Sequence, residues 1–104
     1  MKAMFSAAYS FNQNIGNWDV SKVTDMASMF SVAKAFDQDI SKWNTSKVTS
    51  MSYMFNGAWE FNQDISGWDT SKVTDMSNMF YYADAFNNYQ KITASCENNK
   101  CTLT

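Results

Sequence analysis

The sequence predicts an α/β repeat solenoid, a right-handed coil with one short parallel strand and one helix in each 25-residue repeat. Three observations lead to this prediction. The chain repeats itself at a fixed period, one half of each repeat spaces its apolar residues as a helix does, and the other half has the spacing of a short strand. A single repeat cannot bury its apolar face, so stacked repeats must build a shared core.

The period is 25 residues, counted from each Met-Phe pair, and it contains no insertion. It predicts that residues 1–88 form about three and a half stacked repeats. The equivalent apolar positions are Phe5, Phe30, Phe55 and Phe80; Phe11, Phe36, Phe61 and Phe86; Ile15, Ile40 and Ile65; Trp18, Trp43 and Trp68; and Val23, Val48 and Val73.

One half of each repeat has apolar residues at steps of three or four, as from Val73 to Phe86. This spacing places them on one face of a helix of about three turns. We expect Thr24, Thr49 and Thr74 to cap these helices, because a threonine oxygen accepts a hydrogen bond from an unpaired N–H of the first turn.

The other half is represented by residues 64–71, with the sequence DISGWDTS. Its Ile65, Trp68 and Thr70 have a spacing that resembles the strand segment of a leucine-rich repeat. The resemblance implies a leucine-rich-repeat-like coil. Equivalent strands would then pair in parallel, about 4.8 Å apart.

The two ends of the chain differ. Residues 89–104 break the pattern and are predicted to cap the C-terminal end. At the N-terminal end, we expect an unpaired strand near Ile15 to Val20 and the apolar side of the first helix around Phe5 to lie open. An open strand edge is a template for pairing, so we expect a weak homodimer through this edge when the chain is isolated, or continuation by further repeats when it belongs to a longer protein.

Cys96 and Cys101 are the only cysteines, and both lie in the expected cap. A disulfide that staples this short loop in an oxidising compartment is favoured over two free thiols. A metal site would need further ligands, and the chain has no histidine.

The composition excludes most enzyme chemistry, because the chain has no His and none of its eight basic residues is Arg. A glycosidase remains as the competing class, and it needs two unequal carboxyl groups in a cleft. Near-identical repeats would give near-identical surroundings to its candidate acids, so we expect no catalysis and no cofactor. The candidate acids are Asp19, Asp39, Asp64 and Asp69.

A formal net charge of −2 predicts no nucleic-acid partner, and the absence of a long apolar run predicts no direct membrane insertion. The methionine stripe could bind a soft metal, but its spacing favours core packing. Likewise, the repeated tryptophans could form a stacking platform for sugars or bases, but a core role is favoured. The stripe consists of Met26, Met29, Met51, Met54, Met76 and Met79.

Lys22, Lys47 and Lys72 are equivalent and would lie in a row, one per repeat. Stacked like charges repel unless they are solvated, paired or used by a ligand. A solvated face, partly paired with Asp25 and Asp75, is favoured, and the functional alternative is a stripe that binds sulfated or phosphorylated polymers.

Acidic and amide side chains also recur, including Gln13, Gln38 and Gln63. Such side chains can hydrogen-bond along a stack of repeats. Clustered carboxylate and amide oxygens could also bind calcium, although the chain has no glycine-spaced calcium loop.

Three motifs recur in register: F-N-Q-[DN]-I, W-[DN]-[TV]-S-K-V-T and M-x-x-M-F. Over residues 4–88 the chain resembles a bacterial surface-protein repeat of about 25 to 26 residues, related to BspA-like leucine-rich repeats and abundant in mycoplasma and listerial lipoproteins. The resemblance implies a cell-surface or extracellular location and an adhesion role. It carries no binding residue over to this chain.

The leading functional hypothesis is therefore a non-enzymatic interaction or adhesion module that presents a repeated face to a protein or glycan partner. The alternative is a structural protein that self-assembles, by stacking of solenoids or as a component of a virion or surface layer.

Overall fold

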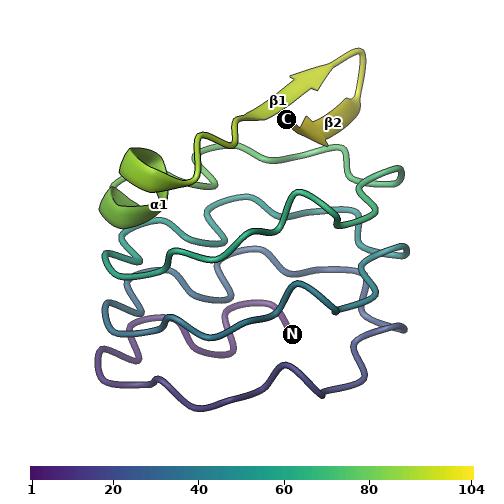
Figure 1. The fold of residues 1–104 in the computed structure, drawn as a ribbon. Coiled ribbons are helices and arrows are strands. Elements are labelled where there is room, and N and C mark those ends of the chain that lie inside the picture. The colour runs from purple at the N-terminus through teal and green to yellow at the C-terminus, as the bar shows by residue number, and fades with distance from the viewer.

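The computed structural model describes residues 1–104 and has regular secondary structure only near the C-terminus (Figure 1). Helix α1 spans Asp84–Tyr89, and strands β1 (Ala94–Glu97) and β2 (Lys100–Leu103) form one antiparallel hairpin. The helix is neither long nor apolar enough to cross a membrane. The predicted α/β solenoid, with a leucine-rich-repeat-like strand and a helix in every repeat, is therefore wrong.

Each repeat is instead a series of tight turns. In the second repeat, the carbonyl oxygen of Met26 accepts a hydrogen bond from the N–H of Met29 at 3.2 Å, and that of Phe30 accepts one from Ala33 at 3.0 Å. A turn of this kind returns the chain after three residue steps, so both of its end residues face inward. The three-residue spacing that predicted a helix arises from these turns.

The expected helix caps and strands are corrected in the same way. Thr49 has no helix to cap: its N–H and its hydroxyl both donate to the carbonyl oxygen of Thr24, at 2.7 and 3.0 Å. The segment from Ile15 to Val20 contains no strand, and the only parallel pairing consists of single bridges that join Asp25, Ser50 and Asp75.

The turns place non-glycine residues in the left-handed region of backbone space. Ser28 and Val32, the third residues of the two turns in the second repeat, have φ values of 58° and 59°. A positive φ at the third residue is the signature of a type II turn, which favours glycine or asparagine there. The position of Val32 recurs in the other repeats as Ala7, Gly57 and Tyr82, and all three have positive φ.

Replacing Gly57 by valine is expected to destabilise the protein by about 1–2 kcal/mol, because a β-branched residue is strained at positive φ. Space is not the cause, since an added Cβ would meet only Val32, at ordinary contact distances of 3.4 Å or more. Gly57→Asn is the control and should cost less, because asparagine tolerates this conformation. Urea denaturation measures both variants, and equal losses of stability would contradict the argument.

Successive repeats stack as layers, one above the other (Figure 1). The N–H groups of Phe5, Phe30 and Phe55 each donate to a methionine carbonyl oxygen of the next layer, all at 2.9 Å. On the threonine side the direction reverses, because Thr74 donates back to Thr49 at 2.9 Å. Each inner layer is therefore held on both sides by backbone hydrogen bonds.

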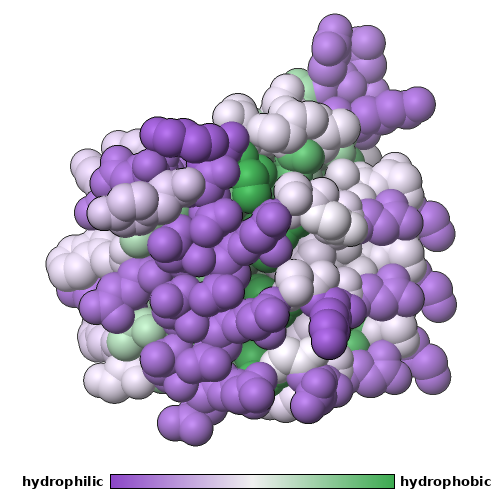
Figure 2. Space-filling model, in the orientation of Figure 1, coloured by the Kyte–Doolittle hydropathy of each residue, from purple (hydrophilic) through white to green (hydrophobic).

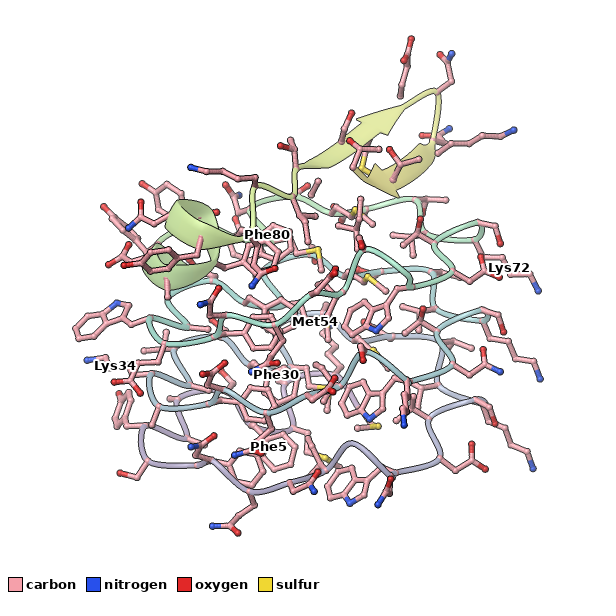
Figure 3. All side chains as sticks on the ribbon, in the orientation of Figure 1. Phe5, Phe30, Lys34, Met54, Lys72 and Phe80 are labelled. Carbon is pink, nitrogen blue, oxygen red and sulfur yellow. A yellow bond between two sulfur atoms is a disulfide. The ribbon has the colours of Figure 1, made fainter.

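The core runs through the layers as two columns of stacked phenylalanine rings, one of which includes the labelled Phe5, Phe30 and Phe80 (Figure 3). Ring centroids of neighbouring layers are 5.5–5.9 Å apart, and the two rings within a layer are 4.0–4.1 Å apart. The six methionines of the stripe are all buried beside these columns, which confirms their core role.

The C-terminal segment closes the last layer. Helix α1 displaces the repeat by two residues, so Gln90 hydrogen-bonds to Asn62 as Gln63 does to Asp37, and Ile92 packs against the core. The repeated contacts therefore continue, shifted by two residues, into the start of the predicted cap. Cys96 and Cys101 form the predicted disulfide across the hairpin, and the N–H of buried Cys101 donates to the carbonyl oxygen of Val73 at 3.1 Å.

Candidate functional site

The lysine row, which consists of Lys22, Lys47 and Lys72, is solvent-exposed in all three layers. The labelled Lys72 extends away from the body of the protein at the right-hand edge in Figure 3. Figure 2 shows hydrophilic groups projecting along this same edge. The 25-residue period therefore places one exposed lysine at the same position of three successive layers.

A short turn precedes each of these lysines and fixes its backbone. The N–H groups of Ser21, Ser46 and Ser71 donate to the side-chain oxygens of Asp19, Asn44 and Asp69, at 2.9–3.0 Å. Local hydrogen bonds of this kind are typical of Asx-turns.

The charges of Lys22 and Lys72 act on Asp19 and Asp69, whereas the expected partners were Asp25 and Asp75. Hydrogen bonds from Ser21 hold the pKa of Asp19 below its ordinary value, and the positive charge of Lys22 adds to the effect. By contrast, Asp25 and Asp75 accept hydrogen bonds from the N–H groups of Ala27 and Ser77, both at 2.9 Å.

Five aspartates share one environment: each lies on the surface, and hydrogen bonds from the serine two residues later lower its pKa. They are Asp19, Asp39, Asp64, Asp69 and Asp75. The aspartates therefore act as turn-forming residues.

This arrangement predicts a loss of stability in acid. A pKa lowered in the folded state adds stability above the pKa of the unfolded state, about 3.9 for Asp. As the pH falls below that value and through the lowered pKa values, the five contributions disappear. Thermal unfolding should show the melting temperature falling between about pH 4 and pH 2.

The control for this prediction is Asp64→Asn combined with Asp69→Asn. Asparagine keeps the acceptor oxygen, as Asn14 and Asn44 already do at equivalent positions. The double variant should therefore fold and show a shallower dependence on pH. A dependence as steep as that of the unmodified chain would contradict the assignment.

A polar ladder runs along another side of the stack. The amide nitrogens of Gln38, Gln63 and Gln90 donate to the side-chain oxygens of the preceding layer, at 3.0, 2.8 and 2.8 Å. These bonds join the layers, as the sequence predicted for the glutamines. No three side chains among His, Cys, Asp and Glu come together as a metal-ligand set.

The tryptophans divide into two groups. Trp43 and Trp68 are buried, and their indole N–H groups donate to the carbonyl oxygens of Ile15 and Ile40 at 3.0 Å. The core role predicted for these two is confirmed. The core role predicted for Trp18 is wrong, because Trp18 is exposed, and Trp59, which lies outside the repeated series, is exposed as well.

The sequence did not predict an aromatic edge, which we define by Tyr9, Lys34 and Trp59. These residues occupy one equivalent position in three successive layers, and the Lys34 ammonium lies 5.2 Å from the ring centroid of Tyr9 and 4.2 Å from that of Trp59. Because the residue type changes from layer to layer, repetition gave no signal. The available signal was the variation itself, at one position of an otherwise regular repeat.

A family model with the description "Mycoplasma protein of unknown function, DUF285" matches residues 1–99. The match covers all of the stacked layers, α1 and β1. No curated protein and no solved structure matches the chain.

Proposed function

The chain belongs to the DUF285 family, and on this premise we propose that it is a non-enzymatic interaction or adhesion module that binds a protein or glycan partner. The proposal includes the closer relationship to BspA-like surface repeats and a location at the cell surface or outside the cell. The Cys96–Cys101 disulfide supports this location, because disulfides persist mainly in oxidising compartments.

The observation that carries the proposal is the lysine row. Three exposed ammonium groups lie at equivalent positions of successive layers, with Asp19 and Asp69 beside Lys22 and Lys72. A ligand with regularly repeated acidic groups could bind all three lysines at once. Several weak contacts made at once also raise the overall affinity without any deep pocket.

The experiment compares the unmodified domain with a row variant, in which Lys22, Lys47 and Lys72 are changed to glutamine. Its control carries the same change at three exposed lysines outside the row, Lys42, Lys91 and Lys100. Both variants have the same net charge, so a non-specific charge effect would weaken them equally. Both are applied to arrays of purified host-surface proteins and of glycans.

Selective loss of binding in the row variant is the expected result. Absence of binding to every protein and glycan on the arrays would overturn the proposal. Equal loss in the two variants would show that the lysine row is not the binding surface.

Self-assembly is the second candidate function, and the N-terminal layer favours it. Phe5 and Phe11 are only half-buried, whereas their equivalents in the second and third layers are fully buried. A second copy could cover these rings. Light scattering at increasing concentration tests for this dimer, and Phe5→Lys should abolish it. Ile15 is unsuitable for the test, because it lies inside the core.

A further inference from the structure

We propose that the aromatic edge binds a neutral oligosaccharide chain. This inference rests on the proposed interaction role and adds a second binding surface to it, at the edge opposite the lysine row. Figure 3 shows Lys34 and Lys72 on opposite edges of the stack.

The first argument is the exposure of the rings. Tyr9 is 58% exposed and Trp59 is 50% exposed, although the core of this protein is built from aromatic side chains. Tyr82, which is 62% exposed, lies two residues before Asp84, the next member of the same column. Large aromatic side chains gathered on one exposed surface mark binding sites more often than chance placement does.

The second argument is that Lys34 holds the rings of Tyr9 and Trp59 in place. Its ammonium lies over both the Tyr9 and the Trp59 rings, an attractive arrangement between a cation and the negative face of an aromatic ring. The backbone also holds the edge, because the N–H of Glu60 donates to the carbonyl oxygen of Lys34 at 3.2 Å, and that of Ala85 donates to Trp59 at 3.2 Å. Rings held in place lose less conformational entropy when a ligand binds.

The third argument is the chemistry around the rings. The exposed carboxylates of Glu60 and Asp84 can accept hydrogen bonds from hydroxyl groups, and Lys34 can donate them. The face of each ring that Lys34 does not cover can pack against the C–H face of a sugar ring, which leaves the sugar hydroxyls free to reach these polar groups.

The charges select a neutral chain over an acidic one. Two carboxylates, of Glu60 and Asp84, outnumber the single ammonium of Lys34, so the edge does not attract a polyanion. An acidic ligand fits the lysine row instead. The two opposite edges therefore suit ligands of different charge.

Affinity electrophoresis through gels that contain dextran, galactomannan or hydroxyethyl cellulose tests the inference. We expect at least one of these neutral polysaccharides to retard the unmodified domain. Trp59→Ala should weaken binding by about tenfold, because an aromatic stacking contact contributes up to about 1.5 kcal/mol and each 1.4 kcal/mol corresponds to about a factor of ten in affinity. Tyr9→Ala should also weaken binding.

Tyr53→Ser is the matched control. Tyr53 is 43% exposed but occupies a different column, where the preceding repeat has Ser28. This variant should be retarded as strongly as the unmodified domain. Because Trp59 lies on the surface, its alanine variant should keep the melting temperature of the parent, which separates loss of binding from loss of fold.

Fluorescence supplies an independent readout. Sugar stacking on Trp59 should shift the tryptophan emission to shorter wavelength, and Trp59→Ala should abolish the shift. Retardation that is the same for Trp59→Ala and the unmodified domain would overturn the inference, as would the absence of retardation by every neutral polysaccharide. If a purified protein binds through the lysine row while no polysaccharide does, the glycan inference fails and the proposed function stands.

Discussion

Replacing Phe55 by alanine is expected to destabilise the protein by about 3–5 kcal/mol, which is a large part of the total stability of a domain of this size. Phe55 is fully buried at the centre of the phenylalanine columns, 4.1 Å from the ring of Phe61 and 5.5 and 5.8 Å from those of Phe30 and Phe80. Its removal leaves a cavity between two layers. Urea denaturation followed by tryptophan fluorescence measures the loss.

Phe5→Ala is the matched control, because Phe5 belongs to the same column but is only half-buried. Its removal should cost clearly less than that of Phe55, since less apolar surface is returned to water. If the two variants lost the same stability, the columns could not be the main source of cohesion between layers.

Replacing Gly16 by alanine is expected to cost about 1–3 kcal/mol through overpacking. An added Cβ would lie 2.5 Å from the carbonyl oxygen of Asp39, which belongs to the next layer. Because the obstructing atom is backbone, no side-chain rotation can relieve the contact. The first and second layers must therefore move apart, which weakens the hydrogen bonds between them.

Gly67→Ala provides the comparison for this variant, because an added Cβ there has no neighbour within 4 Å. Thermal unfolding should show a clear decrease in melting temperature for Gly16→Ala and almost none for Gly67→Ala. Equal melting temperatures would be incompatible with the close approach of Gly16 to Asp39.

The sequence was sufficient to predict the period of the repeat and most of the core. Stacked phenylalanines, methionines and the two inner tryptophans lie where the periodicity placed them. Local structure was mispredicted, because a run of tight turns and a helix both return the chain to one side after about three residues. Apolar spacing alone does not separate the two.

The residues with positive φ explain why the amino-acid types gave little indication of these turns. Among the turns of the stacked layers, only Gly57 and Asn78 have the residue types that such turns favour. Val32 and Tyr82 occupy the position equivalent to Gly57 without being glycine or asparagine. The hydrogen bonds between layers hold these residues in place against their own preference. Tertiary contacts therefore override local propensity here.

The candidate site was predictable only where it repeats. The lysine row follows directly from the period, and the structure places it on the surface. The aromatic edge depends on side chains of different type at equivalent positions, such as Lys34 and Trp59, and becomes visible only when the layers are stacked. With only two cysteines in the chain, the sequence identified the single possible internal pair, and the structure shows that this pair forms a disulfide.

The closing segment touches the stack mainly through its last layer, as in the bonds from Gln90 to Asn62 and from Cys101 to Val73. Each inner layer, in turn, bonds only to its immediate neighbours. Duplication or loss of one repeat in the gene would therefore lengthen or shorten the protein without disturbing the C-terminal end. Such events would add or remove one lysine of the row at a time, so recombination within the gene would change the number of contacts open to the ligand proposed for this row.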